Sequence, residues 1–260
     1  MPAHDLALLT EAALSAGEIA MRYWNQRPAF WEKDGGHGPV TEADLAVNEM
    51  LVERLRAARP DYGWLSEETE DSGARQKNER VFIIDPIDGT RAFLAGENTF
   101  AHSMAVAEHG RVTAAVVYLP ALDRLYTACS HGPAMCDGAE IAASRVAGLE
   151  GATLLTSQPN LAPQHWPGGV PEVKRSFRAS LAYRLCLVAE GRFDGMLMLR
   201  DAWEWDIAAG ALIAERAGAV VSDRTGAAIT FNAAWPQSAG VIAAAPGLHD
   251  ALMTRLRPAA

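Results

Sequence analysis

Asp85-Pro86-Ile87-Asp88-Gly89-Thr90 is the stretch from which the interpretation of this chain starts. The residues before it, 81–84, are Val-Phe-Ile-Ile, and this β-branched and aromatic run predicts a short buried strand. Asp85 is expected where that strand ends, because Pro86 biases it toward an extended conformation. Gly89 allows a sharp turn and a close approach of a ligand to the main chain. The two carboxylates, three residues apart across this turn, can therefore face one cavity.

Acidic residues elsewhere in the chain extend this pattern. Glu67 is followed by Glu68 after the strand-like segment 63–66, and Asp206 follows Trp205 far downstream. Carboxylate and carbonyl oxygens are the ligands that magnesium, calcium and manganese prefer. The hypothesis is one hard-cation site formed by Glu67, Asp85, Asp88 and Asp206. The alternative is that the aspartates only satisfy turn amides, since Asp-Pro and Asp-Gly are common turn dipeptides. The spacing excludes an EF-hand.

Four blocks of the sequence resemble the signatures of the inositol monophosphatase superfamily. In chain order they are Pro39-Val40-Thr41-Glu42-Ala43-Asp44, Leu65-Ser66-Glu67-Glu68, Ile84-Asp85-Pro86-Ile87-Asp88-Gly89-Thr90 and Trp205-Asp206-Ile207-Ala208-Ala209-Gly210. The resemblance implies a lithium-sensitive phosphomonoesterase that uses about two or three Mg²⁺ ions, for which Mn²⁺ can substitute. It also implies a five-layered αβαβα sandwich, whereas periodicity alone indicates only a mixed α and β chain.

The same resemblance implies roles for individual residues. The implied metal ligands are Glu67, Asp85, Asp88, Asp206 and the carbonyl of Ile87. Asp44 and Thr90 are implied to orient the attacking water, with help from Glu67. The expected substrate-binding residues are Gly89, Thr90, Ser180 and Arg200. Thr41 and Asp44 also fit the N-cap and capping box of a helix, and this structural role is compatible with the catalytic one.

The sequence leaves the identity of the substrate open between several phosphorylated metabolites. Inositol-specific relatives carry a Glu where this chain has Leu199, while Glu204-Trp205-Asp206 and Ser180-Leu181 resemble bacterial 3′(2′),5′-bisphosphate nucleotidases. Arg178, Arg184 and Arg200 are candidates to meet a second phosphate, the alternative being solvated surface charges. The expected reaction is therefore hydrolysis of 3′-phosphoadenosine 5′-phosphate to AMP. Inositol-1-monophosphatase, or histidinol-phosphatase, is the alternative. A non-catalytic protein- or RNA-binding member is the alternative of another class, and the retained acids, Thr90 and Asp44 argue against it.

Composition limits the partners and the location of the protein. The 260 residues are 49% hydrophobic and 21% charged, which is typical of a globular protein, and the formal net charge is −9. This charge argues against general binding to nucleic acid or anionic membranes, so the expected partner is a small phosphorylated metabolite. Three cysteines without metal or redox spacing, and no recognisable targeting segment, predict a reducing, cytoplasmic location. A homodimer is expected because dimers are common in the family.

The order of patterns along the chain predicts two intimate halves of one catalytic unit. Residues 1–150 are expected to form an α+β half that carries most metal ligands, with an antiparallel meander over 102–128 and an exposed, mobile flap over 71–80. Residues 151–260 are expected to form an α/β half that carries Asp206 at the start of a small-residue helix over 206–217.

Overall fold

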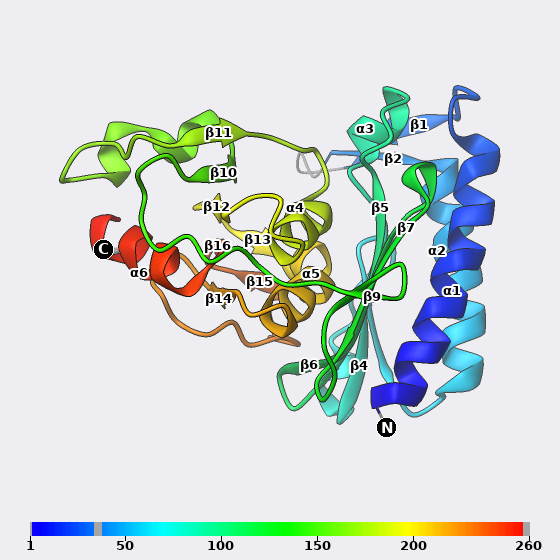
Figure 1. Ribbon diagram of the computed structural model, residues 1–260. Helices are drawn as coiled ribbons and strands as arrows, with labels where there is room; N and C mark the ends of the chain where they lie inside the picture. Colours follow the sequence, from blue (N-terminus) through cyan, green and yellow to red (C-terminus); the bar gives the residue numbers. More distant parts are fainter. Residues whose placement is uncertain (1, 34–37, 257–260) are drawn as a thin grey trace.

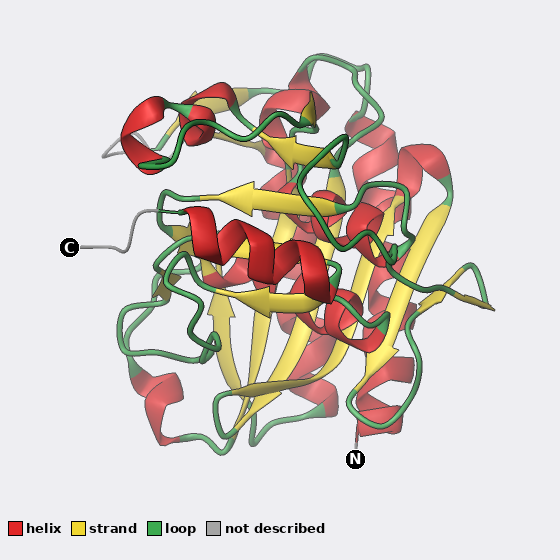
Figure 2. Cartoon of the chain, turned by 60° about the vertical axis from the view of Figure 1, so that its left-hand side comes forward, coloured by secondary structure: helices red, strands yellow, loops and turns green. Residues whose placement is uncertain are grey.

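The computed structural model describes residues 2–33 and 38–256 of the chain. Helices and sheets alternate in five layers, which Figure 1 shows from right to left. The first layer is α1 (Pro2–Tyr23) and α2 (Glu42–Ala58), and the third is α4 (Leu181–Ala189) and α5 (Glu204–Arg216). The fifth is α6 (Pro246–Arg255), which lies across the outer face of the second sheet in Figure 2. The predicted αβαβα sandwich is confirmed.

The first sheet, between the outer helix pair and the inner helix pair, has seven strands in chain order. They are β3 (Gly63–Ser66), β4 (Arg80–Asp88), β5 (Ala101–Glu108), β6 (Arg111–Leu119), β7 (Arg124–Cys129), β8 (Met135–Cys136) and β9 (Ala139–Glu140). All pairs from β4 onward are antiparallel, so the predicted meander is confirmed. The pair of β3 and β4 is parallel, and this exception brings together two acidic residues of the site described below.

The second sheet is mixed and has five strands. In spatial order they are β11 (Lys174–Ser176), β10 (Thr153–Thr156), β12 (Gly195–Met198), β16 (Val241–Ala244) and β14 (Val220–Ser222). Its β10 pairs in parallel with both neighbours, whereas β16 is antiparallel to both of its own. Two small sheets complete the fold, β1 (Phe30–Glu32) with β2 (Pro39–Thr41) and β13 (Ala202–Trp203) with β15 (Gln237–Ser238).

Strand β4 continues through the acidic motif, beyond the end predicted at Asp85. The register shifts between Asp85, which pairs with Ser103, and Asp88, which pairs with Ala101. Such a bulge accommodates Pro86, which has no N–H to give to the ladder. The carbonyl of Pro86 is instead hydrogen-bonded to Nδ1 of the buried His102. The motif is therefore an irregular strand end that a neighbouring strand supports.

Small residues on α5 allow it to pack closely between the two sheets. A Cβ on Gly210 would lie 2.6 Å from Cβ of Leu185 on α4, so only glycine fits this contact. The helix begins at Glu204, two residues before the predicted start at Asp206. The carboxylate of Glu204 accepts hydrogen bonds from the N–H groups of Asn232 and Ala233, at 2.6 and 2.9 Å, and so ties the helix start to a distant loop.

Segment 71–80 contains the 3₁₀ turn η2 (Ala74–Lys77) and is mostly exposed, as predicted. Arg75 is the exception, because its side chain is only 1% exposed. It donates hydrogen bonds to Asp71, Asn232 and the carbonyl of Ala233, which anchors the segment to the second half of the chain. Within residues 2–33 and 38–256, no helix has the length and apolar character needed to cross a bilayer.

Candidate active site

Parallel pairing of β3 with β4 brings two of the predicted metal ligands together. Ser66 is paired with Ile84, and the N–H of Glu67 donates to the carbonyl of Ile84 at 3.1 Å. Glu67 and Asp85 therefore leave the same edge of the sheet side by side. Asp206, in the first turn of α5, approaches from the neighbouring helical layer. Carboxylate oxygens of these three residues all lie within 4.8 Å of one another.

Asp88 connects this cluster to the start of α4. Its Oδ2 accepts hydrogen bonds from Oγ of Ser180 and from the N–H of Ala182, both at 2.6 Å. Ser180 is the N-cap of α4 and also accepts from the N–H of Tyr183 at 2.9 Å. The hydroxyl proton of Ser180 is thus committed to Asp88, and a contact of Ser180 with substrate stays a prediction.

Gly89 makes the close approach of the motif to α4 feasible. Its φ of +94° lies in the left-handed region that favours glycine. A Cβ at this position would come within 3.3 Å of the N atom of Ser180. The turn after Asp88 and the N-cap of α4 therefore lie against each other, as the predicted sharp turn requires.

Burial and like charge raise the pKa values of the clustered acids. The pKa of Asp85 and that of Asp206 are well above the usual range because both carboxyls are buried and face other acids. Burial raises the pKa of Asp88 to about 6, although its hydrogen bonds from Ser180 and the α4 backbone oppose the change. In their ionised form, carboxylates at these separations need a compensating cation. Their hard oxygen donors fit Mg²⁺ or a similar ion.

Asp44 and Thr90 have separate partners in the described part of the chain. Oδ2 of Asp44 accepts from the N–H and Oγ1 of Thr41, at 2.8 and 2.5 Å, and so closes the predicted capping box. Its Oδ1 is buried and has no partner among the described residues, and burial raises the pKa of Asp44 to about 7. Thr90 Oγ1 donates to the carbonyl of Ile87 at 3.1 Å, and no hydrogen bond joins it to Asp44 within the described ranges.

Two arginines add positive charge beside the acids. The guanidinium of Arg184 donates to the carbonyls of Arg178 and Ala179, at 2.5 and 3.1 Å, and lies 4.2 Å from the ring centroid of Phe177. Burial lowers the pKa of Arg184 to about 10, and Asp88, Arg200 and Asp206 are close enough to affect it. Arg200 is exposed and lowers the pKa of Asp206, which burial and the neighbouring acids raise.

Sequence reasoning missed several residues that contact the site. Lys33 Nζ lies 2.7 Å from Oε1 of Glu67 and 2.6 Å from Oε1 of Glu68. His102 supports Pro86 from β5, and burial lowers its pKa to about 4, so it is neutral at physiological pH. Ser103 Oγ donates to the carbonyl of Trp205 at 2.9 Å. None of these positions carries a local motif; only the pairing of β5 with β4 brings the last two to the site.

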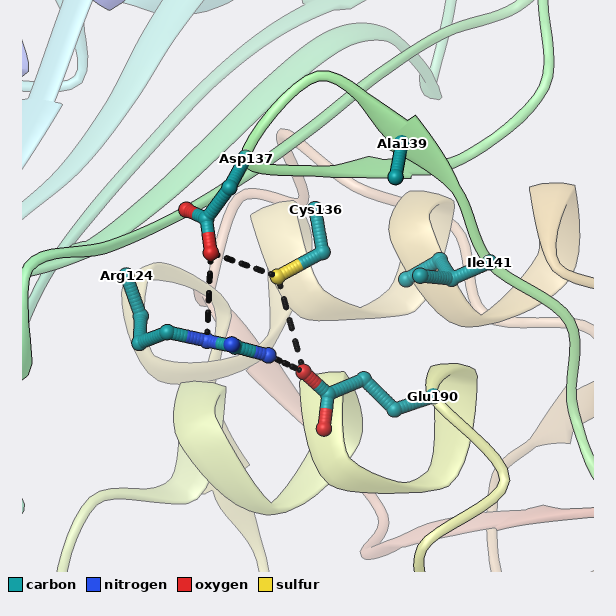
Figure 3. Close-up of a pocket in the computed structure, with 6 residues that line it drawn as sticks. All are labelled: Arg124, Cys136, Asp137, Ala139, Ile141 and Glu190. Carbon is teal, nitrogen blue, oxygen red and sulfur yellow. Dashed lines mark hydrogen bonds and ion pairs between the residues drawn. The ribbon is translucent and has the colours of Figure 1, made fainter.

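A separate pocket of about 390 Å³ lies away from the acids, and Figure 3 shows its lining. The lining residues are Arg124, Cys136, Asp137, Ala139, Ile141 and Glu190. Arg124 forms ion pairs with Glu190 and Asp137, so the polar groups of the pocket satisfy one another. Burial raises the pKa of the Cys136 thiol to about 12, which makes it a poor nucleophile. The acidic cluster is therefore the better candidate for an active site.

A five-layered sandwich with clustered hard oxygen donors between its layers fits the class of metal-dependent phosphatases. The chain belongs to the inositol monophosphatase family, whose family model matches residues 2–259. This confirms the family, the fold and the class of metal-dependent phosphoric monoester hydrolase that the motifs predicted.

Individual relatives agree with this assignment. An inositol-1-monophosphatase of Rhizobium meliloti (strain 1021) is 37% identical over 223 residues, which cover 82% of each chain. The Nus factor SuhB of Haemophilus influenzae is 30% identical and covers 97% of this chain and 96% of its own. The solved structure of an IMPase from Thermotoga maritima has a TM-score of 0.83 at 29% identity, covering 98% of this chain and 96% of that one.

Proposed function

We propose that the chain is a Mg²⁺-dependent phosphomonoesterase whose substrate is a small phosphorylated metabolite with a second anionic group. The first candidate is 3′-phosphoadenosine 5′-phosphate, with AMP as product. The observation that carries the proposal is the cluster of Glu67, Asp85 and Asp206, whose oxygens lie within 4.8 Å of one another, with Asp85 buried and the other two half-buried. The family to which the chain belongs supports the reaction class.

Five groups of this chain would hold the metal. They are the carboxylates of Glu67, Asp85, Asp88 and Asp206 and the carbonyl of Ile87. About two or three Mg²⁺ ions, or Mn²⁺ in their place, would neutralise the anionic phosphate and acidify a water. Ser180 and the α4 backbone fix the orientation of Asp88, and His102 fixes the bulge that carries Ile87. The chain itself thus holds these two proposed ligands in place.

Asp44 and Thr90 are proposed to hold the attacking water. Oδ1 of Asp44 is a buried acceptor without a partner among the described residues, so a water proton can satisfy it. With a pKa of about 7, this carboxyl can take up a proton near neutral pH. The Thr90 hydroxyl, which donates to Ile87, still offers a lone pair to the same water. The amides of Gly89 and Thr90 are proposed to meet the phosphate.

Arg184 supports a substrate with a second anionic group. Two backbone carbonyls and the Phe177 ring hold its guanidinium in place beside Asp88 and Asp206. Its Nη1 makes no hydrogen bond to the described residues, while Nε and Nη2 are both engaged. A planar guanidinium fixed in this way suits phosphate recognition. Arg200 is proposed to add a second, solvent-exposed charge on the same side.

Inositol-1-monophosphatase is the second candidate function. The Rhizobium meliloti relative at 37% identity carries that name, which favours this activity. Leu199, whose apolar side chain cannot bind ring hydroxyls, disfavours it. Sensitivity to Li⁺, a homodimer and a cytoplasmic location stay predictions. The location rests on the three free cysteines, Cys129, Cys136 and Cys186.

The test is phosphate release from 3′-phosphoadenosine 5′-phosphate, inositol 1-phosphate and histidinol phosphate, with Mg²⁺, with EDTA and with added Li⁺. We expect the bisphosphate to be hydrolysed fastest and EDTA to abolish activity. Arg184→Met should lower kcat/KM for the bisphosphate by roughly 10- to 100-fold, as loss of a charge-assisted hydrogen bond does, and change the other two substrates little. The matched control is Arg216→Met, which removes a guanidinium bonded to the carbonyl of Gly132.

Two results would redirect the assignment. If inositol 1-phosphate is hydrolysed fastest and Arg184→Met is neutral, the chain is an inositol monophosphatase. If Mg²⁺ binds but none of the three substrates is hydrolysed, a binding role becomes the better explanation. A protein or RNA partner would then be sought, starting from the relatives named Nus factor SuhB.

A further inference from the structure

One lysine contacts the proposed metal ligands directly. Nζ of Lys33 is 2.7 Å from Oε1 of Glu67 and 2.6 Å from Oε1 of Glu68. The three side chains are largely buried, with exposed fractions of 17%, 19% and 5% in that order. In residues 2–33 and 38–256, the pair of Lys33 with Glu67 is the only ion pair that Glu67, Asp85 or Asp206 makes. Among these described residues, Lys33 is therefore the cation in direct contact with the cluster.

The ammonium of Lys33 and a metal ion require the same carboxylate. Glu67 contributes to the three-carboxylate cluster with Asp85 and Asp206, and its Oε1 is the atom that Lys33 contacts. A divalent cation bound to this carboxylate would repel a positive charge held 2.7 Å from one of its oxygens. Occupation of Glu67 by Lys33 and occupation by a metal thus oppose each other.

We infer that Lys33 is the resident counter-cation of the metal-free centre and competes with the metal for Glu67. When a metal binds, the ammonium leaves Glu67 and becomes accessible at the edge of the site. This inference rests on the proposed role of Glu67 as a metal ligand. It adds that the chain itself neutralises part of the site before any ion arrives, at the expense of metal affinity.

The geometry of Lys33 suits such an exchange. Its backbone directly follows β1, and its N–H donates to the carbonyl of Gly38 at 2.9 Å, so the main chain is held while the side chain can turn. Lysine carries a compact charge on a flexible stem, unlike the fixed fork of arginine. Glu68 lies beside Glu67 outside the three-carboxylate cluster and offers the ammonium a second partner after Glu67 is taken.

An ordinary structural ion pair makes a different prediction. If Lys33 only stabilised the fold, its loss would lower the melting temperature equally with and without metal and leave metal affinity unchanged. Competition predicts that its loss lowers the melting temperature without metal but not in saturating metal, because Lys33 stabilises only the metal-free form.

The first experiment compares Lys33→Met with the wild type in calorimetric Mg²⁺ titrations and thermal melts. We expect Lys33→Met to bind Mg²⁺ about tenfold more tightly, an effect between those of exposed and buried ion pairs. Its melting temperature should fall in EDTA and recover in saturating Mg²⁺. Arg59→Met is the matched control, because it breaks a remote ion pair of 2.9 Å with the buried Asp5. It should lower the melting temperature by the same amount in EDTA and in saturating Mg²⁺. Equal or weaker Mg²⁺ binding by Lys33→Met overturns the inference.

The second experiment needs no variant. The chain has three lysines, Lys33, Lys77 and Lys174, and the last two are exposed. Acylation of the wild-type protein with an amine reagent, followed by mass spectrometry, gives the modification rate of each. We expect Mg²⁺ to raise the rate at Lys33 severalfold and to leave Lys77 and Lys174 unchanged. An unchanged rate at Lys33 in a protein that binds Mg²⁺ and releases phosphate refutes the inference alone. Absence of Mg²⁺ binding refutes the proposed function as well.

Discussion

Replacement of Asp88 by Asn should stabilise the metal-free protein at alkaline pH. Oδ2 of Asp88 accepts two hydrogen bonds of 2.6 Å, from Ser180 and Ala182. An asparagine carbonyl oxygen has two lone pairs and can accept the same two bonds, so the substitution removes mainly the charge. The stabilising or destabilising effect of that charge is therefore what the variant measures.

The magnitude follows from the pKa of Asp88. Burial raises this pKa from 3.8 to about 6, which means that the folded state binds the proton more tightly than the unfolded state. The free energy of unfolding contributed by this carboxyl is thus fully present below pH 3.8 and is lost as the pH rises through about 6. Roughly two pKa units correspond to about 3 kcal/mol. Asp88→Asn lacks the ionisable group and so does not lose this stability. Its free energy of unfolding should exceed that of the wild type by about 3 kcal/mol at pH 8 and by about half of that at pH 5.

Urea unfolding in EDTA at these two pH values, followed by tryptophan fluorescence, measures the difference. Asp194→Asn is a matched control, because Asp194 also accepts one backbone and one hydroxyl hydrogen bond, at 2.8 and 2.7 Å from Thr153. Although partial burial acts to raise the pKa of Asp194, its hydrogen bonds lower it overall, so Asp194→Asn should destabilise the protein at pH 8. Saturating Mg²⁺ should reverse the order of wild type and Asp88→Asn, since the ion stabilises the folded wild type. A variant less stable than the wild type at pH 8 in EDTA, or an advantage equal at both pH values, would refute the reasoning.

Three further substitutions test other parts of the site. Asp85→Asn should lower the rate of phosphate release by orders of magnitude while circular dichroism stays unchanged, and a folded variant with near-wild-type turnover contradicts the metal-ligand assignment. Gly89→Ala should lower the free energy of unfolding by about 1–2 kcal/mol, because φ is +94° and the added Cβ meets Ser180; a neutral result in urea titrations would show that the turn relaxes. Glu204→Gln should lower the free energy of unfolding by about 2 kcal/mol in the same titrations, since the two N–H groups bond to different carboxylate oxygens, Oε2 and Oε1, and an amide replaces one of them with a donor; an unchanged midpoint argues against this anchor.

The parts of the fold that carry local signals were predictable from the sequence. Thr41 and Asp44 form the expected capping box, and β3 has the expected ends. Asp85, Asp206 and Glu67 converge as expected, because signature blocks identify them. The bulge that extends β4 to Asp88 was not predicted, since it depends on pairing with β5.

Contacts between segments far apart in the chain were the least predictable. Lys33 meets Glu67 across 34 positions of sequence, and a lone lysine before a glycine-rich stretch of sequence has no pattern to mark it. Arg75 is buried in a segment whose composition indicates an exposed loop, because its partner Asn232 is 157 positions away. Ser180 was expected to face substrate, but the structure also makes it the hydroxyl donor that fixes Asp88.

The carboxylates of the cluster come from parts of the chain that are synthesised at very different times. Glu67 and Asp85 are synthesised early and on adjacent strands, whereas Asp206 belongs to α5, which must dock between the two sheets. A nascent chain that has not yet released α5 lacks Asp206 and also the helix that packs against one face of β4, so it cannot complete the carboxylate cluster. If the proposed metal binds there, it can do so only after α5 has docked between the two sheets, so metal binding would report completed assembly of the two halves.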